Sequence, residues 1–210
     1  MMDTLLKKAR VIAVVTLHNL KDAIPLARAL QAGGISTIEI TLRTEIALDA
    51  IIAIHQAYPE LTIGAGTVLT PHQLRSVQEQ GASFAVSPGF LPSLGEAAQN
   101  LKMPFLPGVC TPSEIMAALS LGFHCLKLFP AEWAGGAAML RQYHTVFPDI
   151  RFCPTGGVTE SKLSEYLQLP NVLAVGGTWM TPTSLIAHQD FDAIHALAER
   201  AVQTAAKYPI

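Results

Sequence analysis

The chain has 210 residues, of which half are hydrophobic and 14% are charged, and its formal net charge is −2. A composition this apolar excludes a disordered chain and suits strands that are buried on both faces. Because the sequence contains no basic run and no acidic tail, nucleic acid is not an expected partner. The length predicts a single domain, residues 1–210, with a substantial hydrophobic core.

Neither a membrane span nor a metal site is expected. No stretch approaches the roughly 18 apolar residues that cross a bilayer, and Thr16 and His18 interrupt the apolar run that follows the basic N-terminus, so it does not resemble a signal peptide. The seven histidines do not cluster at metal-ligand spacing. The three cysteines are far apart, which predicts reduced packing residues of a cytoplasmic protein. They are Cys110, Cys125 and Cys153.

Short apolar runs alternate with amphipathic segments along the whole chain. After a short helix at Asp3–Ala9, eight runs are predicted as strands, each followed by a helix. Thr70 is the expected N-cap of the helix that Pro71 opens. The predicted strands are Val11–Val15, Thr37–Leu42, Leu61–Gly66, Phe84–Ser87, Pro104–Pro107, His124–Phe129, Arg151–Pro154 and Val172–Val175. The predicted helices are Asn19–Ala32, Thr44–Tyr58, Pro71–Gln80, Leu91–Leu101, Pro112–Leu121, Gly136–Phe147, Glu160–Leu167 and Phe191–Ala206.

Eight strand–helix units in series imply an α/β fold with an all-parallel sheet, and eight is the number that closes a (β/α)8 TIM barrel. The prediction is therefore one such barrel with a short N-terminal helix. The alternative is an open, doubly wound sheet, which is disfavoured because no Gly-x-Gly-x-x-Gly fingerprint follows the first strand. In a barrel, functional residues gather at the carboxyl ends of the strands.

Lys127 lies inside the apolar run of the sixth predicted strand. A buried ammonium either finds a partner or loses its proton, and a neutral lysine is a nucleophile whose usual chemistry is Schiff-base formation. On the second strand, alternation puts Glu39, Thr41 and Arg43 on the face opposite Ile38, towards the barrel axis. Glu39 and Lys127 are thus expected to point into the same interior. The alternatives are a purely structural Glu39–Lys127 or Glu39–Arg43 ion pair.

Glycine-rich turns follow several predicted strands. Gly64–Thr67, after the third strand, allows a ligand close to the backbone and offers the Thr67 hydroxyl. Thr155-Gly156-Gly157 and Gly176-Gly177-Thr178 follow the seventh and eighth strands. Paired glycines after those two strands are typical of a phosphate site, because their backbone N–H groups can converge on an anion.

These motifs together resemble the bifunctional KDPG/KHG aldolases, which act on 2-dehydro-3-deoxy-phosphogluconate and 4-hydroxy-2-oxoglutarate. The resemblance extends from about Val11 to about Lys207, with the motifs in the family's order. The segments that carry it are Glu39–Glu45, Gly64–Leu69, Ser87–Gly89, Lys127–Glu132, Arg151–Gly157 and Gly176–Gly177.

The resemblance implies a class I aldolase without metal or cofactor, usually a homotrimer, that acts on pyruvate and a phosphorylated 2-keto-3-deoxy sugar acid. Lys127 matches the Schiff-base lysine and Glu39 the proton-shuttling glutamate. Arg43 and Thr67 match contacts of the pyruvyl carboxylate, and Thr155 matches a position linked to stereochemical choice. The phosphate site falls on the turns at Gly156, Gly157, Gly176 and Gly177, with Thr178 as a further hydroxyl donor.

Two functional alternatives remain. A phosphosugar isomerase or epimerase on the same barrel would use Glu39 as a carbon base and Lys127 as an electrostatic stabiliser. A barrel that only binds a phosphorylated metabolite would not need a lysine in its core.

The Leu42–Glu45 segment favours the gluconate branch over a sister family that acts on the galactonate analogue. The sequence departs from the family pattern at two places. Many members have serine at the position of Thr178, and the loop after Glu132 contains Trp133-Ala134.

Overall fold

The strands lie side by side and run parallel to one another. The computed structural model describes residues 1–210. Six strands form one sheet in the order β5-β4-β3-β2-β1-β9, and three form a second, β6-β7-β8. All strand pairs are parallel, as predicted. The strands are β1 (Val11–Val15), β2 (Thr37–Thr41), β3 (Thr62–Gly66), β4 (Phe84–Val86), β5 (Phe105–Leu106), β6 (Gly108–Val109), β7 (Cys125–Leu128), β8 (Arg151–Phe152) and β9 (Val175–Gly177).

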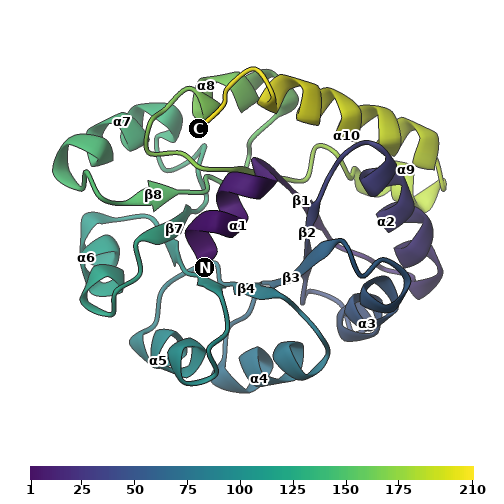
Figure 1. The fold of residues 1–210 in the computed structure, drawn as a ribbon, viewed down its shortest axis with the longest axis horizontal. Coiled ribbons are helices and arrows are strands. Elements are labelled where there is room, and N and C mark those ends of the chain that lie inside the picture. The colour runs from purple at the N-terminus through teal and green to yellow at the C-terminus, as the bar shows by residue number, and fades with distance from the viewer.

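Helices surround the strands, and α1 lies across the centre of the arrangement (Figure 1). The prediction of a helix after each strand is confirmed for most of the chain, although α9 was not predicted. The helices are α1 (Met2–Ala9), α2 (Ala23–Ala32), α3 (Ala47–Ala57), α4 (Pro71–Glu79), α5 (Pro92–Asn100), α6 (Pro112–Ser120), α7 (Gly136–Val146), α8 (Leu163–Leu167), α9 (Thr183–Ala187) and α10 (Phe191–Ala205), with 3-10 turns η1 (Leu20–Asp22) and η2 (Glu160–Lys162).

Two separate apolar cores follow from the alternation of side chains along the strands. The larger one contains 52 buried residues, among them Ile38 and Ile40, and lies between strands and helices. The smaller one has ten buried residues and includes Met2 and Leu6 of α1 together with Ile12 of β1. Because α1 directly precedes β1, it closes the amino-terminal end of the strands and leaves the carboxyl end for a site.

The predicted single closed sheet is present as two sheets that meet at two seams. At the first, only Pro107 separates β5 from β6. Proline has no N–H to give to a ladder, although its carbonyl still accepts a hydrogen bond from the Lys127 amide at 2.8 Å. At the second seam, isolated parallel bridges join Phe152 to Val172 and Thr155 to Gly176. The structure thus shows a parallel α/β fold, with these contacts bridging the two sheets.

Element boundaries differ from the predictions mainly at the ends of segments. The helix expected from Asn19 begins as the η1 turn, and the strand expected at Val172–Val175 begins only at Val175. Thr70 is the N-cap of α4 as predicted: its hydroxyl accepts from the Gln73 amide, and the Gln73 side chain accepts from the Thr70 amide. None of the helices has both the length and the apolar character needed to cross a bilayer.

Candidate active site

Glu39 and Lys127 meet between opposite strands, as the alternation argument predicted. The Lys127 Nζ donates to Glu39 Oε1 at 3.3 Å, and their side chains are 7% and 4% exposed. Glu39 is the central residue of β2, and Lys127 lies on β7 in the other sheet. Burial of two charges this close requires that each serve as the other's partner. The alternative Glu39–Arg43 ion pair is not formed.

Two neighbours fix the geometry of this pair. A Cβ added to Gly66 on the adjacent β3 would lie 2.2 Å from Glu39 Oε1, so the carboxylate occupies space that only a glycine leaves open. The Lys127 ammonium lies 5.1 Å from the centroid of the Phe129 ring, within the range of a cation–π contact. The amine is therefore held between a carboxylate and an aromatic face.

Cys153 is buried close to the Glu39–Lys127 pair but does not share its chemistry. Burial raises the pKa of the Cys153 thiol to about 12, and the charge of Lys127 offsets this only in part. The thiol therefore stays protonated at neutral pH and is a poor nucleophile. No three histidine, cysteine or carboxylate side chains lie close enough together to hold a metal ion.

Arg43 and Thr67 lie after their strands, at the carboxyl end. β2 ends at Thr41, so Arg43 is in the following turn, where its side chain is exposed and forms no ion pair. The prediction that alternation along the strand orients Arg43 is thus wrong, since the strand is too short. Thr67 has a φ of 59°, a left-handed conformation that non-glycine residues seldom adopt. It is half-buried directly after β3.

The two glycine pairs are brought together, but they differ in structure. Gly156 and Gly157 form a turn with φ values of 99° and 76°. Gly176 and Gly177 were predicted as a turn and instead belong to β9, where both are buried. They are glycines because of packing: an added Cβ would lie 2.5 Å from Thr155 Oγ1 at Gly176 and 1.7 Å from the Trp179 ring at Gly177.

Free backbone N–H groups remain at this end of the strands. The Gly176 amide donates to the Pro154 carbonyl at 3.0 Å, so it is not available to a ligand. The amides of Gly156, Gly157 and Thr178 donate no hydrogen bond within the chain, and Thr178 is exposed. Successive free amides in a left-handed turn form an anion-binding concavity. The Gly156-Gly157 turn therefore keeps its predicted character, whereas Thr178 replaces the second glycine pair.

Two polar contacts near the site were not predicted. Thr16 Oγ1 and Thr41 Oγ1 share a hydrogen bond of 2.8 Å between the ends of β1 and β2. The Glu132 carboxylate accepts hydrogen bonds from Tyr166 Oη and Lys162 Nζ. Local sequence carries no signal for either contact, because the partners are 25 to 34 residues apart.

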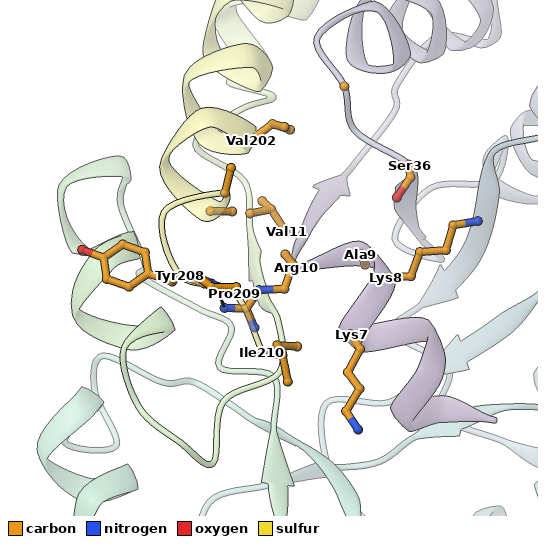
Figure 2. Close-up of a pocket in the computed structure, with 13 residues that line it drawn as sticks. Lys7, Lys8, Ala9, Arg10, Val11, Ser36, Val202, Tyr208, Pro209 and Ile210 are labelled. Carbon is orange, nitrogen blue, oxygen red and sulfur yellow. Dashed lines mark hydrogen bonds between the residues drawn. The ribbon is translucent and has the colours of Figure 1, made fainter.

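A cavity of about 690 Å³ lies at the other end of the strands (Figure 2). Lys7, Lys8 and Arg10 line it, and Arg10 reaches toward the C-terminal segment, whereas the Lys8 side chain points away from that segment. Arg10 donates to the carbonyls of Leu173 and Tyr208, at 2.6 and 2.5 Å, and Lys7 pairs with Asp3. Since the chain's own groups already engage two of these three cations, we interpret the cavity as the seam between the two ends of the chain.

Comparison with known proteins agrees with this geometry. The family model for KDPG and KHG aldolase matches residues 2–197. The chain belongs to this aldolase family. It is similar to the 2-dehydro-3-deoxy-phosphogluconate aldolase of Pseudomonas aeruginosa, with 45% identity over 98% of this chain and 94% of the relative. It is also similar to the KHG/KDPG aldolase of Escherichia coli K12, with 43% identity over 97% of this chain and 95% of the relative.

A solved structure of another family member bears on the chemistry. The KDPG aldolase of Legionella pneumophila superposes with a TM-score of 0.94 and 42% identity, over 96% of this chain and 98% of that one. That structure is described as holding pyruvate captured at low pH as a covalent carbinolamine intermediate. A carbinolamine is the adduct that an amine forms with a ketone on the way to a Schiff base.

Proposed function

We propose that the protein is a class I aldolase that cleaves 2-dehydro-3-deoxy-6-phosphogluconate to pyruvate and glyceraldehyde 3-phosphate. It also cleaves 4-hydroxy-2-oxoglutarate to pyruvate and glyoxylate. The observation that carries the proposal is the buried contact of 3.3 Å between Lys127 Nζ and Glu39 Oε1. An amine nucleophile beside a carboxylate that can accept and return its protons is what Schiff-base cleavage requires. Membership of the aldolase family supports the same reaction.

The first half of the reaction joins the substrate to Lys127. The neutral amine attacks the C2 ketone, and the resulting carbinolamine loses water to give a protonated imine. Glu39 transfers the protons that these two steps require, directly or through a water molecule. The Glu39 carboxylate receives the proton that leaves the Lys127 ammonium. Both groups then become neutral, so the attack does not leave an unpaired charge in the interior.

The second half breaks the C3–C4 bond. The protonated imine accepts the electron pair of that bond while Glu39 takes the proton of the C4 hydroxyl, and the aldehyde product leaves. The enamine that remains on Lys127 is protonated at C3 and hydrolysed to pyruvate, which regenerates the amine. The protein needs no metal or cofactor for these steps, because the imine itself is the electron sink.

The groups at the carboxyl end of the strands bind the rest of the substrate. Arg43, exposed and unpaired after β2, binds the pyruvyl carboxylate in a two-point fork, and Thr67 adds a hydroxyl. Thr155 packs against Gly176, and we assign to it the stereochemical choice at the reacting carbon. The free amides of Gly156, Gly157 and Thr178 bind the phosphate.

At the level of architecture, we propose that residues 1–210 form one domain, a (β/α)8 barrel with the N-terminal helix closing one end. The bridges at Phe152–Val172 and Thr155–Gly176 support closure, since the first joins β8 to the segment before β9 and the second joins the segment after β8 to β9 itself. A closed barrel brings β2 and β7 across from each other, which is how Glu39 can contact Lys127.

The proposed assembly is a homotrimer. The support from this chain is apolar surface: Leu69 and Leu91 are 50% and 56% exposed and line the same shallow cavity with Phe90. Apolar side chains that gather on a surface are typical of protein contacts. Light scattering coupled to size-exclusion chromatography is expected to give three times the 22.5 kDa chain mass. A mass equal to that of one chain at micromolar concentration would contradict the assembly.

Borohydride trapping tests the proposed function. The protein is mixed with excess pyruvate and reduced, and the modified peptide is mapped by mass spectrometry. The expected result is one carboxyethyl group, located on Lys127, because this is the buried lysine that lies beside a carboxylate able to take its proton. Folded protein that gains no adduct would exclude the Schiff-base aldolase and favour an isomerase on the same barrel.

A further inference from the structure

The Glu132 carboxylate lies at the junction of three segments outside the Glu39–Lys127 pair. Oε1 accepts from the Tyr166 hydroxyl and Oε2 from the Lys162 ammonium. Tyr166, on α8, is fully buried, whereas Lys162, at the end of η2, is 46% exposed. Glu132 itself follows β7 and is 18% exposed. One carboxylate therefore ties the loop after β7 to the helical segment after β8.

The backbone around Glu132 is bound to the Gly156-Gly157 turn. The Ala131 amide donates to the Thr155 carbonyl at 2.8 Å, and the Glu132 amide donates to the Gly156 carbonyl at 3.1 Å. An added Cβ on Gly157 would lie 2.8 Å from Glu132 Cβ. The stem of Glu132 thus packs directly on the turn whose amides are free.

The same residue contacts this turn and the helical segment that follows it. Its amide donates to the Gly156 carbonyl in the turn, and its carboxylate binds Lys162 and Tyr166 of the helical segment that follows, five and nine residues after Gly157. Burial by itself would raise the pKa of the Glu132 carboxyl, but the hydrogen bonds from Lys162 and Tyr166 lower it below its ordinary value. The group is therefore ionised at neutral pH and keeps both contacts.

We infer that Glu132 is a positioning residue for the phosphate-binding turn, and that it determines how well the enzyme binds phosphorylated substrate. It does not touch the reacting atoms. This inference rests on the proposed function, because the phosphate is assigned to the Gly156-Gly157 turn there. A turn whose two free amides must point at one anion loses affinity when the turn can move relative to the segments that support it.

The test compares two variants that loosen the turn in different ways. Glu132→Gln keeps the shape but removes the charge, and Tyr166→Phe removes one hydrogen bond without changing any charge. Both are expected to raise KM for the phosphorylated substrate about five- to tenfold, the effect of one lost hydrogen bond, with little change in kcat. KM for 4-hydroxy-2-oxoglutarate, which has no phosphate, is expected to stay within about twofold.

The matched control is Glu165→Gln, the same chemical change on an exposed residue of α8 whose side chain has no hydrogen-bond partner. It is expected to leave both KM values unchanged. Thermal unfolding verifies that each variant is folded, and Tyr166→Phe serves as the deciding variant if Glu132→Gln does not fold.

Three outcomes would overturn the inference. Equal increases in KM for the two substrates would indicate a general structural role. An unchanged KM for both substrates would show that the turn keeps its geometry without these contacts. A lower KM for the phosphorylated substrate in Glu132→Gln would mean that the carboxylate only repels phosphate. Failure of the proposed function gives a different result, since pyruvate would then leave no adduct on Lys127 even in the unaltered protein.

Discussion

Replacing Lys127 with alanine is expected to reduce turnover of 2-dehydro-3-deoxy-6-phosphogluconate by about 10⁴-fold or more, because it removes the nucleophile and with it the covalent route. The rate of pyruvate release measured with a coupled assay tests this directly. The same variant is expected to gain no adduct when it is mixed with pyruvate and reduced. A near-normal rate in this variant would refute the Schiff-base mechanism.

Lys127→Ala also changes stability, and this effect must be separated from the chemical one. It leaves the carboxylate of Glu39, only 4% exposed, without its partner. Breaking a buried pair in this way costs about 3–5 kcal/mol of unfolding free energy. The double variant Lys127→Met with Glu39→Gln removes both charges and is expected to recover most of that loss while remaining inactive.

The matched control is Lys8→Ala, which removes an exposed lysine of α1 at the opposite end of the strands. Full activity is expected there, because Lys8 lines the cavity between the chain ends and does not contact the Glu39–Lys127 pair. Reduced activity in both variants would point to the loss of one positive charge and not to loss of the nucleophile.

Replacing Glu39 with glutamine is expected to lower kcat by about 100-fold or more, the usual contribution of one acid–base group. Glutamine has nearly the same shape and still accepts a hydrogen bond from Lys127, so the loss reports proton transfer. Steady-state kinetics measure kcat, and trapping with pyruvate shows whether the imine still forms. We expect it to form, but slowly.

The result with Glu39→Gln also distinguishes the aldolase from the isomerase alternative. An isomerase that used Glu39 as its carbon base would lose activity in this variant while never forming an adduct at Lys127. In the aldolase, both the adduct and the slowed cleavage are expected. A rate close to that of the unaltered protein would show that some other group, such as a bound water molecule, moves the protons.

Local patterns in the sequence were sufficient for the main features of the site. Lys127 in an apolar run and Glu39 at an alternating position of β2 predicted a shared interior, and their contact of 3.3 Å confirms it. The order of strands and helices predicted a parallel α/β fold. These features are local in origin, because periodicities of 2 and 3.6 residues determine which side chains become buried.

Other features depended on contacts between segments far apart in the chain. Alternation failed at Arg43 because β2 ends two residues earlier, and Gly176-Gly177 proved to be a strand because β1 and the Thr155 side chain pack against it. Pro107, read as the end of one strand, divides the strand ladder into two sheets.

The sequence by itself determined the succession of elements, the buried lysine and glutamate, and the glycine turn at Gly156-Gly157. Only the tertiary structure decided which amides remain available to an anion and that Glu132 joins the turn to the helical segment that follows it. Its partner Tyr166 is 34 residues away. The physical reason is that hydrogen bonds and close packing act over a few ångströms in space, whereas a sequence pattern records only neighbours along the chain.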